Sequence, residues 1–256
     1  MTRALITGGT SGIGLAFAKA LASDGYDLVL VARTPTTLAE IKSELEREYG
    51  ITAETLAADL SKRPDLDAVA ERASRGDLDA IVNNAGYGLR GTFLDNDLAA
   101  WEAQDDVLTR AVMVLSHAAG RAMRDRGSGM IINVSSVAGY TTMGVYAAAK
   151  SWTTVFSEAL ATELAGTGVH VTAVLPGFVH SEFHRRAGLN MSWLPAAGWL
   201  TAEHVAGRGL SDARAGKTLS IPGAVYQVAA RVARIAPRPL IRGISGGFAS
   251  RRIKSN

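Results

Sequence analysis

The chain has 256 residues, 47% of them hydrophobic and 20% charged, so it can bury a sizeable core and is neither a disordered nor a fibrous protein. The absence of cysteine excludes disulfides, thiol catalysis and cysteine-based zinc sites, and the five histidines show no metal-ligand spacing, so we expect no metal site. No apolar run is long enough to cross a bilayer as a helix, and no leader-like pattern opens the chain, so we expect a cytoplasmic protein.

The net charge of +3 is unevenly distributed along the chain. Residues 225–256 contain no acidic side chain, whereas residues 1–224 are net negative. The basic side chains of this tail are Arg231, Arg234, Arg238, Arg242, Arg251, Arg252 and Lys254. Such asymmetry favours an anionic partner for the tail.

Short runs rich in Val, Ile and Leu alternate with longer helical patterns along the chain. The predicted strands are Ala4–Thr7, Asp27–Ala32, Thr52–Ala57, Ala80–Asn83, Met130–Val134, Val169–Leu175 and Thr218–Ile221. Helical patterns lie between them at Leu15–Ser23, Leu38–Tyr49, Leu66–Ser74, Trp101–Arg124 and Tyr146–Leu164. Strands that are apolar on both faces and separated by helices predict an α/β fold. We expect a Rossmann-type, doubly wound parallel sheet of about seven strands in a single domain over residues 1–256.

A glycine-rich turn, TGGTSGIG, follows the first predicted strand at residues 7–14. In such a turn Gly8 permits a tight bend, Gly12 lets the backbone approach a pyrophosphate, and Gly14 allows the helix to pack closely on the strand. The following helix then presents free N–H groups to phosphate. A glycine-rich turn alone is weak evidence, because glycines also serve ordinary turn geometry.

Further motifs occur in a fixed order, each at a predicted strand end or in the loop after it. These are Asp59-Leu60, Asn83-Asn84-Ala85-Gly86, Ser136, the pair Tyr146 and Lys150, and Pro176-Gly177. In this order, together with the glycine turn, they resemble the short-chain dehydrogenase/reductase family in its short single-domain form. The resemblance covers the chain from residue 2 to about residue 182.

The resemblance implies an oxidoreductase with a nicotinamide dinucleotide site. The residues that it implies in that site are Gly8, Thr10, Ser11, Gly12, Ile13 and Gly14 in the turn, Asp59 and Leu60 at the adenine, Asn83, Ala85 and Gly86 at the ribose and central region, and Tyr146, Lys150, Pro176, Gly177, Val179 and Ser181 at the nicotinamide end.

Arg33 bears on the choice between the two nicotinamide cofactors. An acidic side chain at the end of the second strand would bind the ribose 2′-hydroxyl of NAD and repel a 2′-phosphate. This chain has no acid there and instead carries Arg33, whose guanidinium can clamp a phosphate. Relatives with arginine at this position generally prefer NADP. We therefore expect NADP(H), with a solvated loop arginine as the alternative interpretation.

Tyr146 and Lys150 are four residues apart and share one face of the predicted helix. A free phenol has a pKa near ~10, too high for a base at neutral pH. An ammonium group nearby and the positive nicotinamide of an oxidised complex would lower that pKa. Tyr146 could then take a proton from an alcohol or give one to a carbonyl oxygen.

The fifth predicted strand ends at two serines. Ser136 is expected to hydrogen-bond the reacting oxygen as charge develops on it. Ser135 is the alternative, although the family pattern points to Ser136. By resemblance, Lys150 also holds the nicotinamide ribose.

Two features depart from the family pattern. The loop over residues 137–145 is shorter than in most members. Leu108, in Asp106-Val107-Leu108-Thr109, stands where the family usually has an asparagine that holds a water linking the catalytic lysine to solvent. We expect this relay to be lost, or rerouted through backbone carbonyls or Thr109, giving a slower enzyme or one with a shifted pH optimum.

Residues 178–200 resemble a substrate lid, with apolar side chains at Val179, Phe183, Leu189, Met191, Trp193, Leu194 and Trp199. With Tyr87, Leu89 and Tyr140 they suggest an apolar pocket for a medium-sized ketone, aldehyde or alcohol. The alternative is that they only pack the lid onto the body.

In the basic tail over residues 225–256, Val225, Val228, Val232 and Ile235 form an amphipathic pattern that ends at Pro237. This pattern suits a weak contact with an anionic membrane surface, a subunit contact, or a helix packed beside the active site. Nucleic acid is not expected, because no binding motif accompanies the charge. Residues 243–256 are expected to form a flexible end.

The sequence therefore predicts an NADP(H)-dependent oxidoreductase that acts through Ser136, Tyr146 and Lys150, as a homodimer or homotetramer. The first alternative is a cofactor-binding regulator or scaffold protein that has lost turnover, for which Leu108 is the only support. A second alternative is a related epimerase or dehydratase with a tightly held nucleotide, which the glycine spacing and short length disfavour.

Overall fold

The computed structural model describes residues 2–180 and 198–253. Within these residues one sheet of seven parallel strands has the order β3-β2-β1-β4-β5-β6-β7. The strands are β1 (Arg3–Thr7), β2 (Asp27–Ala32), β3 (Ala53–Ala57), β4 (Ala80–Asn83), β5 (Gly129–Val134), β6 (Val169–Val174) and β7 (Leu219–Ser220). The strand order reverses between β1 and β4, as expected for a doubly wound fold.

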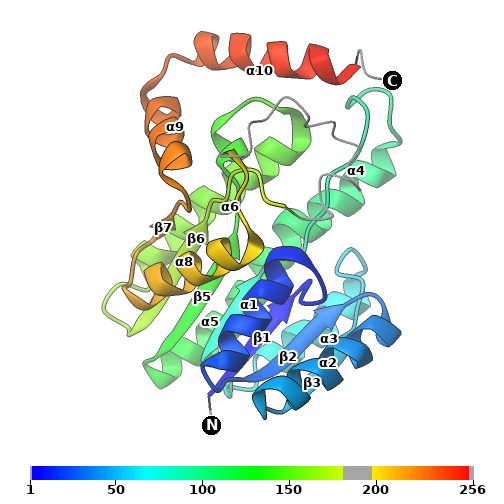
Figure 1. Cartoon of the computed structure of the whole chain (residues 1–256), viewed down its shortest axis with the longest axis vertical. Coiled ribbons are helices and arrows are strands. Elements are labelled where there is room, and N and C mark those ends of the chain that lie inside the picture. Colours follow the sequence, from blue (N-terminus) through cyan, green and yellow to red (C-terminus); the bar gives the residue numbers. More distant parts are fainter. Residues whose placement is uncertain (1, 181–197, 254–256) are drawn as a thin grey trace.

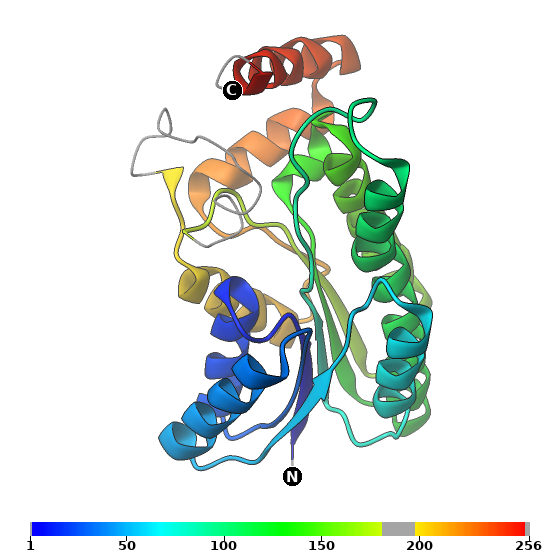
Figure 2. The same ribbon diagram turned by 90° about the vertical axis from the view of Figure 1, so that its right-hand side faces the viewer.

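Helices cover both faces of this sheet (Figures 1 and 2). On one face lie α1 (Gly12–Ser23), α2 (Pro35–Tyr49) and α8 (Ala202–Arg214). On the other face lie α3 (Arg63–Ala73), α5 (Ala111–Arg126) and α6 (Gly144–Glu163). The strands are apolar on both sides because each side packs on helices: in β1, Ala4 and Ile6 belong to one hydrophobic core and Leu5 to the other.

The predicted fold class is confirmed, but two helical regions differ from expectation. The pattern over 101–124 is not one helix. It divides into α4 (Leu98–Asp105), one π-helical turn (Asp106–Arg110) and α5. The helix α8 was not expected from the sequence, because its buried face is made largely of small residues, Ala202, Ala206, Gly209 and Ala213.

The tail forms two helices, α9 (Ala224–Ile235) and α10 (Arg238–Ile253). The expected stop at Pro237 is confirmed, whereas the expected flexible end is wrong through residue 253, where the chain remains helical. Both helices lie beyond the carboxyl ends of the strands, and α10 crosses that end of the molecule (Figures 1 and 2). Among the described residues, no helix is long and apolar enough to cross a membrane.

A buried carboxylate fixes α8 to the last strand. Asp212 is 3% exposed and accepts hydrogen bonds from Ser220 Oγ at 2.8 Å, Arg208 Nε at 2.7 Å and Lys217 Nζ at 2.8 Å. Burial alone would raise the pKa of Asp212, but these hydrogen bonds outweigh it and lower the pKa overall. The ionised form is therefore the one that the fold stabilises.

Replacing this carboxylate, Asp212→Asn, should lower the free energy of unfolding at pH 7 by about 2 kcal/mol, the scale of a charge-assisted hydrogen bond. Because folding lowers the Asp212 pKa, its contribution is complete above the unfolded pKa of about 3.9 and is lost as the pH falls below it. Urea unfolding at several pH values should show this acid-side loss in the wild type and less of it in the variant. Asp125→Asn, at a carboxylate 70% exposed, is the control, and an equal effect there would contradict the assignment.

Candidate active site

The glycine turn between β1 and α1 depends on missing side chains. Gly8 and Gly12 have φ angles of +66° and +54°, in the left-handed region that other residues avoid. A Cβ on Gly14 would lie 2.2 Å from the carbonyl oxygen of Gly8 and 2.4 Å from Asn84 Nδ2. The turn therefore lies close to its neighbours, and α1 begins there with no side-chain cap from Ser11. Its first N–H groups are open to a ligand.

Two side chains connect this turn to the loop after β4. The hydroxyl Oγ1 of Thr7 accepts hydrogen bonds from the backbone N–H groups of Asn84 and Ala85, both at 3.0 Å. In return, Asn84 Nδ2 donates to the carbonyl of Thr7 at 2.9 Å. These contacts fix the two loops against each other at the carboxyl edge of the sheet. The roles of Thr7 and of the Asn84 side chain could not be read from the sequence, because they depend on contacts 77 residues apart.

The remaining residues expected at the dinucleotide lie at this edge in different environments. Asp59 accepts from the Ser61 hydroxyl at 2.8 Å; partial burial raises its pKa, but the Ser61 bonds lower it overall. Arg33 is exposed just after β2, and its charge also lowers the Asp59 pKa. The Asn83 side chain points into the core, where Nδ2 donates to Asn133 Oδ1 at 2.9 Å and Ser116 Oγ at 3.1 Å. The Asn83 side chain therefore supports the site indirectly, by fixing the end of β4 to β5 and α5 within the core.

The structure brings Ser136, Tyr146 and Lys150 together. Ser136 follows β5, whereas Tyr146 and Lys150 stand one turn apart on α6. The side chains of Ser136 and Tyr146 are hydrogen-bonded. Lys150 Nζ lies 5.8 Å from the centre of the Tyr146 ring and donates to the carbonyl oxygen of Val134 at 2.7 Å. The three side chains thus form one cluster beside the end of β5.

Burial determines the protonation of this cluster. Burial raises the pKa of Tyr146 to about 12, while the hydrogen bond with Ser136 opposes the increase. Burial lowers the pKa of Lys150 to about 8. In the protein alone, the Tyr146 pKa is therefore raised, not lowered as expected for a complex with a positive nicotinamide. Tyr146 is a neutral phenol at neutral pH.

The two serines after β5 point in different directions. Ser135 is 2% exposed, and its hydroxyl donates to the carbonyl of Lys150 at 2.6 Å and lies 2.8 Å from Thr154 Oγ1. Ser136, by contrast, faces Tyr146. This geometry favours Ser136 as the serine of the cluster and gives Ser135 a structural role in fixing the backbone of α6.

Leu108 lies against the cluster. It is fully buried in the π-helical turn, and a Cβ on Gly86 would lie 2.8 Å from Leu108 Cδ2 and 3.9 Å from Lys150 Nζ. The Leu108 carbonyl is 3.3 Å from Thr153 Oγ1. The hydroxyl of Thr109 donates to Asp105 O at 2.8 Å within its own helix. An apolar side chain therefore packs beside Lys150, and Thr109 is turned toward its own helix.

Tyr226 of α9 supports the loop after β6. A Cβ on Gly177 would lie 2.1 Å from the Tyr226 ring, so the ring packs directly on that glycine. The Tyr226 hydroxyl accepts from the Phe178 N–H at 3.1 Å and donates to the carbonyl of Gly198. Val179 is 3% exposed and belongs to the core. The role of Tyr226 could not be read from the sequence, since its glycine partner is distant along the chain.

The expected lid lies mostly outside the described residues. Ser181, and the apolar lid residues Phe183, Leu189, Met191, Trp193 and Leu194, fall in this part of the chain. At its described borders, Trp199 stacks on His180 with ring centres 4.5 Å apart.

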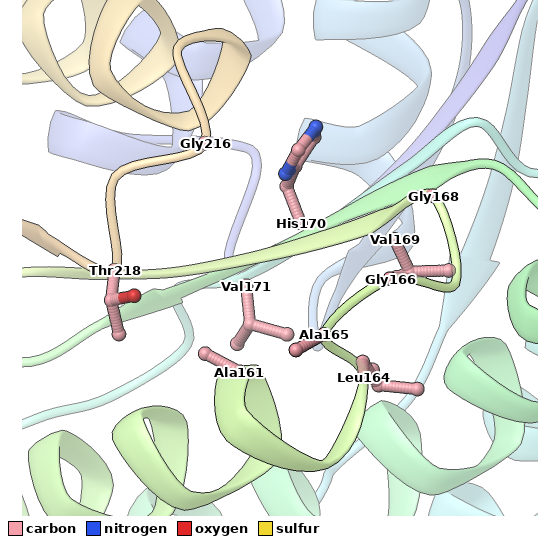
Figure 3. Close-up of a pocket in the computed structure, with 10 residues that line it drawn as sticks. All are labelled: Ala161, Leu164, Ala165, Gly166, Gly168, Val169, His170, Val171, Gly216 and Thr218. Carbon is pink, nitrogen blue, oxygen red and sulfur yellow. The ribbon is translucent and has the colours of Figure 1, made fainter.

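A hollow of about 340 Å³ occurs elsewhere, at the amino end of β6 (Figure 3). It is lined by Ala161, Leu164, Ala165, Gly166, Gly168, Val169, His170, Val171, Gly216 and Thr218. These residues lie at the amino ends of the strands, whereas Ser136 and the glycine turn lie at the carboxyl ends. The hollow is therefore separate from the candidate active site.

Comparison with known proteins identifies the family. The family model described as short chain dehydrogenase matches residues 2–191. This chain belongs to the short-chain dehydrogenase family. An uncharacterized oxidoreductase of Staphylococcus saprophyticus is 33% identical over 181 residues, which cover 69% of this chain and 77% of that protein. The family assignment makes this protein an oxidoreductase.

Two solved dehydrogenase structures are similar over most of the chain. One, from Sphingobium yanoikuyae in complex with NADPH, has a TM-score of 0.84 and 31% identity and covers 98% of this chain and 96% of its own. The other is the bulky-bulky ketone specific alcohol dehydrogenase from Comamonas testosteroni, with a TM-score of 0.80, 29% identity and coverage of 91% and 92%. The two structures therefore share the fold of this chain well beyond the glycine turn and the other sequence motifs.

Leu108→Asn should change the pH dependence of turnover. An amide oxygen beside Lys150 would favour the ammonium form and raise the Lys150 pKa from about 8. The corresponding inflection in a plot of kcat/KM against pH should then move to higher pH. Leu108→Met keeps the volume without the polar group and should leave the profile in place. An unchanged profile in a folded Leu108→Asn variant would show that Leu108 does not tune the lysine.

Proposed function

We propose that this short-chain dehydrogenase is an NADP(H)-dependent enzyme that interconverts an apolar alcohol and its carbonyl compound. The observation that carries the proposal is the Ser136–Tyr146 hydrogen bond beside Lys150, at the sheet edge that also holds the glycine turn. For the cofactor site we propose the residues that were named from the sequence. Asn83 would support this site from the core, through its hydrogen bonds to Asn133 and Ser116.

The proposed chemistry assigns one role to each member of the cluster. Bound NADP(H) supplies or accepts the hydride. Tyr146 gives its phenolic proton to the carbonyl oxygen in reduction, or takes it back from the alcohol in oxidation. Ser136 donates to the same oxygen as negative charge develops there. Lys150 stabilises the phenolate that remains after proton donation. Because Tyr146 is a neutral phenol in the protein alone, it can donate the proton that carbonyl reduction requires.

The glycine turn and Arg33 support the cofactor assignment. The turn has no side chains where a pyrophosphate would approach, and Arg33 stands exposed after β2 with no acidic residue in the same strand end. A guanidinium binds a 2′-phosphate through charge-assisted hydrogen bonds. The NADPH complex of the Sphingobium relative agrees with this choice.

Apolar side chains in the loops that follow β4 and β6 support an apolar substrate. Tyr87 is half-buried after β4, and burial raises the pKa of its phenol. Phe178 packs 6.1 Å from Trp199, measured between ring centres, in the loop after β6. The Comamonas relative is described as specific for bulky ketones, which agrees with this proposal.

The exposed apolar surface of α6 supports self-association. Trp152 and Phe156 stack with ring centres 4.9 Å apart, and Val155 between them is 62% exposed. Burying these side chains against another copy would favour the proposed homodimer or homotetramer.

The proposed acid–base role predicts that Tyr146→Phe lowers kcat by about a hundredfold to ten-thousandfold, because the proton donor is lost. The assay is the absorbance change of NADPH with a panel of apolar ketones and aldehydes. Tyr49→Phe removes a hydroxyl from a tyrosine at the end of α2, outside the proposed site, and is the control. Binding of NADPH without turnover in the wild type would favour a regulator that has lost activity.

The role of Arg33 predicts tighter binding of NADPH than of NADH. Arg33→Ala should weaken NADPH binding by about tenfold, which corresponds to one charge-assisted contact, and leave NADH binding nearly unchanged. Fluorescence titration of both cofactors measures this. Arg75→Ala, on the loop after α3, is the control. Equal or tighter binding of NADH by the wild type would overturn the NADP assignment.

A further inference from the structure

The helix α9 has one buried and one exposed apolar face. Tyr226 and Ala230 are 7% and 2% exposed, and they fix the helix to the body of the protein. The exposed apolar residues are Val225, Val228, Val232 and Ile235, at 64%, 59%, 56% and 85%. Their spacing places them on a single stripe about 15 Å long. We call these four residues the valine stripe.

Four arginines occur within or just after the segment that carries the valine stripe. Arg231 and Arg234 stand on α9, while Arg238 and Arg242 follow at the start of α10, and all four are exposed. Within the described ranges, none of them forms an ion pair. Residues 213–256 contain no acidic residue, and Glu158 of α6 acts on Tyr140 together with Arg234. The surface is thus apolar and carries four arginines that have no salt bridge among the described residues.

We propose that the valine stripe and these arginines dock the protein on an anionic lipid bilayer. An exposed apolar stripe beside cationic side chains fits the boundary between acyl chains and anionic headgroups. The valines enter the acyl boundary and the arginines contact the headgroup phosphates. The proposed contact is peripheral, because it uses only the exposed side chains of α9 and of the start of α10.

The charges disfavour a second copy of this chain as the occupant. In a two-fold symmetric pair the same surface would face itself, so the arginines of both copies would approach one another. Like charges brought together at an interface cost several kcal/mol. An anionic bilayer removes this repulsion and buries the same apolar side chains.

The proposed surface lies at the end of the molecule that carries the candidate active site (Figures 1 and 2). The N–H of Thr142, in the loop before α6, donates to Ser245 Oγ of α10 at 3.2 Å. Burial of Tyr140 raises the pKa of its phenol, while the charge of Arg234 opposes the increase, so α9 is close to this loop as well. Docking would therefore hold the end of the enzyme that carries the candidate active site near the bilayer, whichever substrate the enzyme uses.

Vesicle flotation of the full-length protein tests the proposal. The protein should float with vesicles of phosphatidylglycerol and phosphatidylcholine, and much less with phosphatidylcholine alone. Added NaCl should weaken binding because it screens the arginines. Equal recovery with both vesicle types, or none with either, would overturn the proposal.

Two sets of substitutions separate the contributions of charge and apolar surface. Arg231→Gln with Arg238→Gln should lower the vesicle partition coefficient about 25-fold, at roughly fivefold for each arginine. Val228→Glu with Val232→Glu should abolish binding and leave folding intact, since both side chains are exposed. Leu98→Glu, at a residue 58% exposed on α4, is the matched control and should still bind.

The absence of cysteine allows a direct measurement of insertion. An environment-sensitive fluorophore on Val232→Cys should shift to shorter wavelength with anionic vesicles, whereas the same label on Leu98→Cys should not. Sedimentation of the Val228→Glu and Val232→Glu double variant completes the test. A smaller assembly in that variant, with no vesicle binding by the wild type, would make this face a subunit contact and refute membrane docking.

Discussion

The parallel pairing of β1, β4, β5 and β6 is the constraint on which the site depends. Because all four strands run in one direction, the glycine turn, the loop with Asn84, Ser136 and the Pro176-Gly177 loop meet at one edge, although residues 8 and 177 are far apart in sequence. The same strands are buried on both faces, so the edge has a rigid base. The backbone contributes directly as well, since the last carbonyl of β5, that of Val134, accepts a hydrogen bond from Lys150.

A polar layer inside the core connects this edge to the helices behind it. Asn83 contacts Asn133 across neighbouring strands, and Asn133 Nδ2 donates to the Ser157 hydroxyl of α6 at 2.9 Å. All three side chains are almost fully buried. Buried polar groups are costly unless they are paired, so this chain of bonds permits little change in the position of α6 relative to β4 and β5. The orientation of the helix that carries Tyr146 and Lys150 is thereby fixed.

The sequence predicted the seven strands and most of the helices between them, because hydrophobic periodicity carries that information. The cluster of Ser136, Tyr146 and Lys150 was expected from the order of the motifs and the family that they resemble. It did not predict the contacts of Thr7 with Asn84 or of Tyr226 with Gly177, since each joins segments that only the folded chain brings together. The π-helical turn at Leu108 also interrupts a pattern that reads as one continuous helix. The raised Tyr146 pKa depends on burial, which no local pattern of residue types specifies.

The packing of Tyr226 on Gly177 has a mechanical consequence. The ring leaves no space for even a methyl group, and its hydroxyl is bonded on both sides, to Phe178 and to Gly198. A displacement of α9 must therefore move the backbone on either side of the lid segment. Any ligand that prefers one position of α9 will alter the affinity of the loop after β6 for its own ligand, and the reverse effect must have the same magnitude. In this protein, one aromatic side chain links the position of the tail to that of the loop after β6.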